Sequence, residues 1–473
     1  MDIGVGGWPT TLAINAWTGE PGPTESEIAA DGLAWALRTQ PARPQRYLQP
    51  EPDADLRDWG DPRVGWGLVL PDNDAIPEAD RTVGADAPEP IRALLQARAP
   101  GPVLRYRAEL APTHIRRYYL RRGPQDLAIS GSGRGIGEGQ LPRYLLLYGT
   151  PEKIPWSFQY VLNSACYVGR LHLYGEALGR YVDALLGGWA AACARPTHPV
   201  VWAPDLGSAD ITHLMRMAIT APVHEALAGD DDIGRNVRYL GADGDATVAD
   251  LGKALAGQRP ALVVTTSHGM TGPLDDPAAM ARDLGLLVGE DYELVRPERL
   301  LAGWQPDGAI WYAHACCSAG AAAVSNFHGL FPPGSRIDRL LTEVAALGEQ
   351  VAPLPTALLG ATKPARAFIG HVEPTFDWTI RQRRTGQPLT SSICRALYPN
   401  LFHPAPVGCA FGECYDHVGE LFAQWDQAVR AFNLAQDAGP TLLACQLAAR
   451  DRQSMVILGD PTAVLPALPG GTP

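Results

Sequence analysis

From about residue 143 onwards, the pattern of hydrophobic and polar positions is that of an α/β protein. Short apolar runs rich in β-branched and aromatic residues alternate with longer segments in which apolar positions recur at helical spacing. The runs predict strands at Tyr144–Tyr148, Tyr167–Leu173, Val200–Ala203, Val237–Leu240, Leu262–Thr266, Ala309–His314, Ala365–Ile369 and Met455–Leu458. The amphipathic segments predict helices at Glu176–Trp189, Ile211–Leu227, Ala246–Ala256, near Glu298–Leu301, Ser335–Leu347 and Val418–Ala435. This alternation favours two doubly wound subdomains with mainly parallel sheets.

The first hundred residues lack this rhythm. They are rich in Pro, Asp and Trp, and only Glu25–Leu37 has the spacing of a helix. A chain of 473 residues is also too long for one hydrophobic core. We therefore predict an N-terminal region of irregular fold (1–125), a first α/β subdomain (126–258), a second α/β subdomain that carries the chemistry (259–466) and a tail (467–473).

Two of the predicted strands lead into reactive side chains. The run at Leu262–Thr266 is followed by His268 and Gly269, and the run at Ala309–His314 is followed by Cys316. Open α/β sheets place their functional groups just beyond the carboxyl ends of parallel strands. The chain between His268 and Cys316 is long enough for the helical crossover that parallel neighbours require. We therefore expect the imidazole and the thiol to meet at one edge of the sheet.

A histidine beside a cysteine can act as a catalytic dyad. The imidazole favours the thiolate of Cys316 as nucleophile, and His268 then returns the proton to the leaving group. A glycine after the histidine lets a substrate backbone approach closely, so the amides of Gly269 and Cys316 are the candidate oxyanion hole. The alternative is a buried histidine and a buried cysteine without function, since each is common in cores.

Other residues near this edge are candidates for a role in the same site. Cys317 should face away from the histidine because neighbouring residues alternate sides as a strand ends, and His314 should lie deeper in the core. Asp275 and Asp276 follow His268 in a loop that could hold a basic substrate side chain, although solvation or helix capping is the commoner role of such residues. His371 follows another strand and is either a wall of the substrate groove or a structural hydrogen-bonding group. No metal is expected.

The composition of the chain and the motifs that it lacks argue against several classes of function. The net charge of −12 argues against nucleic acid as the main partner, although arginines alternate with tyrosines between Val103 and Arg122. No stretch approaches the ~18 apolar residues of a membrane span, and the N-terminus lacks a signal-peptide pattern, so we expect a cytoplasmic protein without membrane contact. Serine-hydrolase elbows, zincin motifs and Walker loops are missing from the sequence.

The two motifs, His268-Gly269 and Ala315-Cys316 after hydrophobic runs, resemble those of the caspase-like clan of cysteine peptidases. Residues 141–465 are most similar to gingipain-type peptidases and their bacterial relatives related to the CHAT domain. Further segments carry the resemblance: Leu141–Gly149, Ile154–Trp156, Val168–Leu171, His371-Val372 and Leu458–Pro461. The residues after the nucleophile, Cys317 to Gly320, depart from the family pattern and form a smaller wall.

This resemblance implies a caspase-hemoglobinase fold and a cofactor-free bacterial endopeptidase that cleaves protein or peptide substrates with His268 and Cys316. Relatives of this kind are often triggered proteases in defence or signalling, so an activating protein partner is expected by analogy. Two other functions stay open at this point. One is a catalytically silent scaffold that binds a partner through the same groove, and the other is a small-molecule acyltransferase or amidase using the same dyad.

Overall fold

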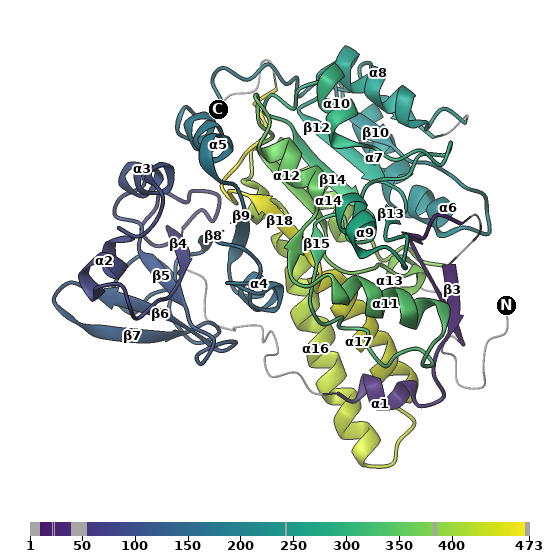
Figure 1. The fold of residues 1–473 in the computed structure, drawn as a ribbon, viewed down its shortest axis with the longest axis horizontal. Coiled ribbons are helices and arrows are strands. Elements are labelled where there is room, and N and C mark those ends of the chain that lie inside the picture. The colour runs from purple at the N-terminus through teal and green to yellow at the C-terminus, as the bar shows by residue number, and fades with distance from the viewer. Residues whose placement is uncertain are drawn as a thin grey trace.

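The computed structural model describes residues 10–20, 22, 24–38, 54–241, 244–381 and 386–468. In this part of the chain the protein is a mixed α/β structure built on a 12-stranded sheet with the order β11-β10-β12-β14-β17-β18-β9-β8-β4-β5-β6-β7, which crosses the whole molecule in Figure 1. Its strands are β4 (Trp66–Pro71), β5 (Val103–Tyr106), β6 (His114–Tyr119), β7 (Arg122–Ala128), β8 (Tyr144–Tyr148), β9 (Tyr167–Leu171), β10 (Val200–Trp202), β11 (Arg238–Leu240), β12 (Leu262–Thr266), β14 (Ile310–His314), β17 (Ala367–His371) and β18 (Met455–Gly459).

The sheet is mostly parallel, as the apolar runs predict. Strands β11 to β17 form one parallel block and strands β18 to β5 form another. β18 is antiparallel to β17 and parallel to β9, so it joins the two blocks. The sequence predicted two separate units, but the structure connects their strands in one sheet. β10 of the predicted first unit pairs with β12 of the second, and the last strand of the chain, β18, lies between β17 and β9.

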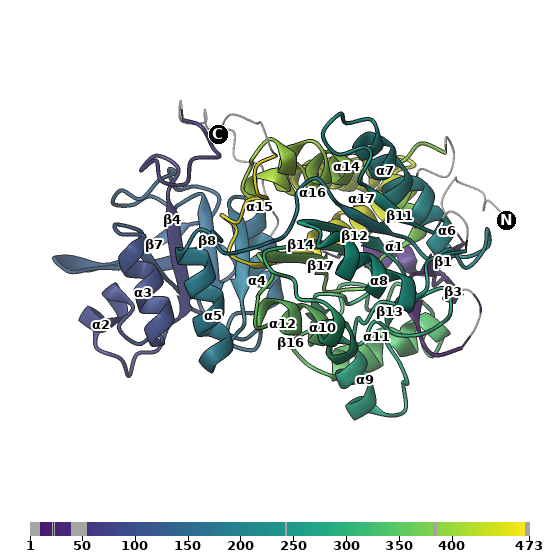
Figure 2. The same ribbon diagram turned by 90° about the horizontal axis from the view of Figure 1, so that it is seen from above.

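Helices cover both faces of the sheet, as Figure 2 shows from above. Successive residues of the central strands point to opposite faces: Val263 and Trp311 belong to one core, Val264 and Tyr312 to the other. The helices on the first face are α3 (Glu89–Ala97), α5 (Gly175–Leu186), α8 (Val248–Gln258), α10 (Pro297–Gly303) and α12 (Pro353–Leu359). Those on the second are α7 (Ala221–Ala228), α14 (Ser391–Leu397), α15 (Val407–Ala410) and the start of α16 (Gly412–Asn433).

The remaining helices connect and flank these layers. They are α1 (Gly32–Ala36), α2 (Glu78–Val83), α4 (Trp156–Asn163), α6 (Ile211–Met215) with the π-helical turn Arg216–Thr220, α9 (Pro277–Asp283), α11 (Arg336–Ala346), α13 (Asp377–Ile380), α17 (Gly439–Gln453) and a 3₁₀ turn at Asn400–Phe402. No helix in the described ranges is long and apolar enough to cross a membrane.

The N-terminal region is more regular than the sequence predicted. Strands β4 to β7 extend the main sheet beyond β8, so residues 66–128 share its hydrogen bonding. The helix predicted at Glu25–Leu37 is wrong in its first half, because Thr24–Glu27 form strand β3, which pairs with β1 (Thr11–Ile14), and only Gly32–Ala36 are helical. The cross-strand hydrogen bonds to β1 override the helical spacing of these residues.

Short two-stranded pairs complete the structure around the sheet edge. β2 (Ala16–Trp17) pairs with β13 (Gly269–Met270), and β15 (Gly320–Ala321) pairs with β16 (Gln350–Val351). The first pair brings the N-terminal arm, residues 10–38 apart from 21 and 23, against the segment that follows β12. The purple arm lies beside β13 in both overall views (Figures 1 and 2).

Candidate active site

Strands β12 and β14 bring His268 and Cys316 to the same edge of the sheet. The two strands are parallel neighbours, and Thr266 pairs with His314 in register. His268 and Cys316 each follow these paired residues by two positions. The structure therefore confirms that these two predicted strands are parallel neighbours. His268 and Cys316 lie at the same distance beyond the paired ends of the strands.

Close backbone contact at Gly269 holds the two segments together. A Cβ atom added to Gly269 would overlap the carbonyl oxygen of Cys316 and would lie 2.9 Å from its amide nitrogen. Any larger residue at this position would therefore push the histidine segment away from the cysteine. The histidine is thus followed by a glycine because the backbone of Cys316 leaves no room for a side chain at this position.

The structure adds a residue that the sequence did not identify, Asp210. Its Oδ1 and Oδ2 atoms lie 3.0 and 3.1 Å from Nε2 of His268, and both side chains are buried. Asp210 is the N-cap of α6 and also accepts hydrogen bonds from the amide and hydroxyl of Thr212. Burial alone would raise the pKa of the Asp210 carboxyl, but the bonds from His268 and Thr212 outweigh burial and hold it below its usual value.

This contact fixes which ring nitrogen of His268 can act as a base. An ionised carboxylate only accepts hydrogen bonds, so Nε2 carries the proton that is donated to Asp210. In the neutral ring, Nδ1 is then the unprotonated nitrogen, and it is buried without a hydrogen-bond partner. A partial signal for Asp210 did exist in the sequence, because it follows the predicted strand Val200–Ala203 and directly precedes the predicted helix Ile211–Leu227.

Cys316 is enclosed and uncharged in this structure. Its side chain is 0% exposed, and Sγ donates a hydrogen bond to the side-chain oxygen Oδ1 of Asn15 from the N-terminal arm. Burial raises the pKa of the Cys316 thiol well above its usual value, and the neighbouring Cys317 raises it further, against the backbone amides of Thr375 and Asn15. The thiol therefore needs a change in its surroundings before it can become a thiolate.

The competing residues occupy different environments. Cys317 is also buried, but it has a left-handed backbone (φ 53°). The Nδ1 atom of His314 is bonded to the hydroxyl of Tyr312 (2.9 Å), and burial lowers its pKa to about 4. His314 is thus a neutral histidine of the core, as expected from its place inside the strand.

His371 is buried in the core, whereas Asp275 and Asp276 lie at the surface. His371 is 2% exposed and its ring contacts that of His314 edge-on, with 4.6 Å between centroids, so it does not line an open groove in this structure. Asp276 caps α9, since its side chain accepts from the amide of Ala279. Asp275 and Asp276 are both exposed in the loop after the histidine segment.

The loop that follows Cys316 is anchored by Glu373. This carboxyl group is 3% exposed and accepts hydrogen bonds from the hydroxyl of Ser325 (2.9 Å) and the amide of Asn326 (2.9 Å), while its own carbonyl accepts from the amide of Cys317. Burial raises the pKa of Glu373 to about 7, more than these hydrogen bonds lower it. A protonated Glu373 thus forms part of the support of the cysteine loop.

This raised pKa predicts a specific dependence of stability on pH. The unfolded chain releases the Glu373 proton near its ordinary pKa of 4.5 and the folded chain near 7, so the stabilisation is present below pH 4.5 and is lost as the pH rises through about 7. Glu373→Gln should remain neutral throughout. Between pH 4.5 and 7.5 the wild type should lose roughly 3 kcal/mol relative to this variant in urea unfolding. Parallel stability curves would contradict the prediction.

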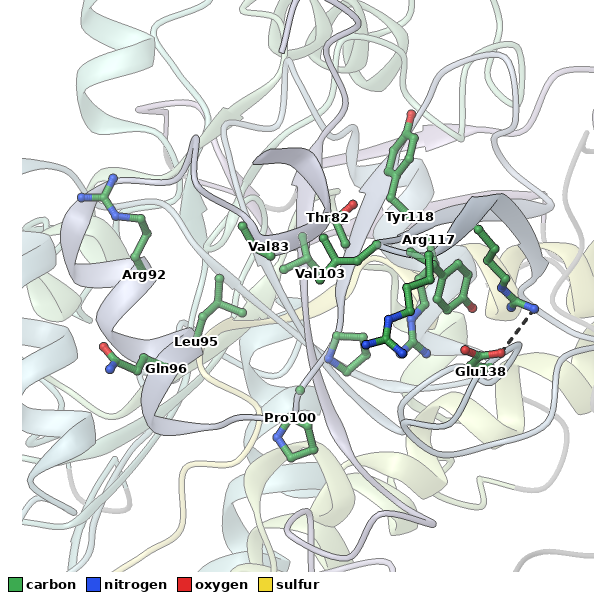
Figure 3. A pocket seen from close by; sticks show the side chains of 16 residues that line it. Thr82, Val83, Arg92, Leu95, Gln96, Pro100, Val103, Arg117, Tyr118 and Glu138 are labelled. Atoms are coloured by element: carbon green, nitrogen blue, oxygen red, sulfur yellow. Dashed lines mark ion pairs between the residues drawn. The ribbon is translucent and has the colours of Figure 1, made fainter. Parts of the chain in front are cut away.

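A separate groove lies around β6 and β7, and Figure 3 shows the side chains that line it. It has a volume of about 850 Å³ and contains part of the arginine and tyrosine segment. Arg117 donates to backbone carbonyls, and Arg122 pairs with Glu138 (3.4 Å). Other arginines of this segment are neutralised, since Arg105 binds Asp86 and Arg116 binds Asp126. None of the residues that line this groove belongs to the cysteine site.

The described residues contain no group of three or more His, Cys, Asp or Glu side chains that could hold a metal ion. Comparison of the chain with protein-family models, curated proteins and solved structures finds no match.

Proposed function

We propose that this protein is a cysteine endopeptidase with a caspase-like arrangement of its central strands, in which Cys316 is the nucleophile, His268 the acid and base, and Asp210 the positioning residue. The observation that carries the proposal is the buried Asp210–His268 contact at the edge where Gly269 touches the backbone of Cys316. A histidine that is oriented by a carboxylate next to a cysteine is the arrangement that activates a thiol. A structural core would need no such alignment.

The reaction would proceed through an acyl-enzyme. Nδ1 of His268 takes the proton of the Cys316 thiol, and Sγ attacks the carbonyl carbon of the scissile bond. The amides of Gly269 and Cys316 would stabilise the oxyanion. The C–N bond then breaks, and His268 gives its proton to the leaving amine. A water molecule, deprotonated by the same imidazole, finally hydrolyses the thioester and releases the acid and the free thiol.

Substrate selection is a further part of the proposal. Asp275 and Asp276 are exposed next to the histidine segment, and two carboxylates there favour a basic residue, arginine above all, on the acyl side of the scissile bond. The Asp276 carboxylate also caps α9, so Asp275 is the better candidate for direct contact with the substrate.

An unbiased peptide library tests this function. The library is incubated with the wild type, with Asn15→Ala, whose shortened side chain no longer bonds to the thiol, and with Cys316→Ala as the matched control. New peptide termini should appear with Asn15→Ala, more slowly or not at all with the wild type, whose thiol is covered, and not with Cys316→Ala. Cleavage by none of them, together with the absence of Cys316 labelling by a peptidyl ketone probe, would favour a binding scaffold instead. Turnover of small amides alone would favour an amidase.

A further inference from the structure

The N-terminal segment Asn15–Trp17 lies directly on the candidate active site. It forms a parallel strand pair with β13, in which Ala16 is opposite Gly269 and Trp17 opposite Met270. The amide of Gly269 donates to the backbone carbonyl of Asn15 (3.0 Å), and the amide of Thr271 to that of Trp17 (2.9 Å). One of the two amides assigned to the oxyanion hole is therefore occupied by a carbonyl of the chain itself.

The side chains of the same segment cover both reactive groups. Oδ1 of Asn15 accepts the hydrogen bond of the Cys316 thiol and a second one from the amide of Thr375 (3.4 Å). The Trp17 ring lies over His268, with 5.9 Å between centroids, and stacks on Tyr292. Asn15 and Cys316 are 0% exposed, His268 1% and Trp17 6%. A substrate cannot reach Sγ while this segment is in place.

The segment is held by contacts that are separate from the main sheet. The β2–β13 pair is a two-stranded sheet of its own. The rest of the arm has independent attachments: the amide of Ala29 donates to the carbonyl of Leu330 (3.0 Å), and the Trp425 indole donates to the carbonyl of Ala36 (2.6 Å). Release of Asn15–Trp17 would therefore break no hydrogen bond of the 12-stranded sheet, and α1 could stay docked.

We infer that the edge of β13 is the site where an extended peptide binds, and that Asn15–Trp17 occupies this site as an intramolecular inhibitor. The inference rests on the proposed function, since it assigns the substrate edge and the regulation of the same cysteine. Extended peptides bind to exposed strand edges through main-chain hydrogen bonds, and Gly269 and Thr271 make such bonds to the segment. The side-chain amide of Asn15 accepts the hydrogen bond of the thiol, and its backbone carbonyl occupies the amide of Gly269, so the segment blocks the nucleophile and one oxyanion-hole donor together.

Alkylation of the thiol tests the inference without requiring catalysis. Iodoacetamide labelling of Cys316 is followed by peptide mapping with mass spectrometry in the wild type, Asn15→Ala, Trp17→Ala and the control Glu25→Ala, whose exposed side chain lies on β3 of the same arm. Removing the cover should increase the labelling rate of Cys316 by about tenfold or more in the first two variants and leave it unchanged in the control. Equal or slower labelling in Asn15→Ala and Trp17→Ala would overturn the inference.

Two further measurements separate a released segment from a loosened fold. Cys317 is equally buried, so its labelling should stay slow, and simultaneous labelling of both cysteines would indicate general loosening and contradict a local cover. A synthetic peptide of residues 10–20, added to Trp17→Ala, should slow Cys316 labelling again, whereas a scrambled peptide should not. Failure of the intact peptide would contradict the assignment of β13 as the binding edge.

The same variants distinguish this inference from the proposed function. If labelling of Cys316 accelerates and peptide hydrolysis rises with it, both are supported. If labelling accelerates and no peptide is cleaved, the segment is a cover for a thiol that is not a peptidase nucleophile. If hydrolysis occurs equally in the wild type and the variants, the peptidase stands and the inhibitory role fails.

Discussion

Replacing either Cys316 or His268 by alanine should abolish peptide hydrolysis, with kcat/KM falling by at least about 10⁴-fold, because residues that act as one unit lose nearly all activity when one is removed. The alanine variants keep the surrounding backbone, and Cys316→Ala removes only the Sγ atom that donates to Asn15. The rates are best measured in the Asn15→Ala background, so that the cover does not limit them.

The matched control is Cys317→Ala. It removes the same atom from the next residue, which is also buried but follows with a left-handed backbone. This variant should keep activity within a few-fold of its parent, and thermal unfolding should show that all variants remain folded. Full activity in Cys316→Ala together with its loss in Cys317→Ala would show that the nucleophile is the second thiol.

The second large effect is expected for Asp210→Asn, with kcat falling about 10²- to 10⁴-fold and KM changing little. An amide in this place can donate to Nε2, which moves the ring proton to Nδ1 and removes the base that accepts the thiol proton. Because asparagine caps helices as well as aspartate does, α6 should be retained and thermal stability should change little. A purely structural role would lower stability instead and leave kcat of the folded fraction intact.

Asp205→Asn is the control for this prediction. Asp205 also binds a histidine, since its Oδ2 lies 2.9 Å from Nδ1 of His213, and it lies in the same loop between β10 and α6. This pair is partly exposed, and the Asp205 carboxylate also binds Arg216 and the amide of Gly207. Its loss should leave kcat unchanged. Equal losses in both variants would mean that Asp210 acts only through the shape of the loop.

The sequence alone determined the sheet strands that follow Arg143 and the edge at which His268 and Cys316 lie. Central parallel strands are buried on both faces, so their sequences are continuous apolar runs. Leu262–Thr266 is a strand with the predicted bounds. The order of motifs along these runs predicts His268 and Cys316 at one edge, and the register of β12 with β14 confirms it. Local patterns suffice to predict these strands because short apolar runs that must be buried on both faces can adopt few structures other than a central strand.

Only the tertiary structure decided what surrounds these two residues. Asp210 is far from His268 in sequence, and its pairing depends on β10 lying next to β12, which no local pattern encodes. Residues 10–20 of the N-terminal arm have no recognisable periodicity, because two-residue strands such as β2 are stabilised by the partner they pair with and not by their own propensity. For the same reason the sequence predicted a helix over Glu25–Leu37, where pairing of β3 with β1 prevails. His268 and Cys316 could thus be located from local sequence. The orientation of His268 by Asp210 and the burial of Cys316 beneath Asn15 depend on long-range contacts that form only when the chain is folded.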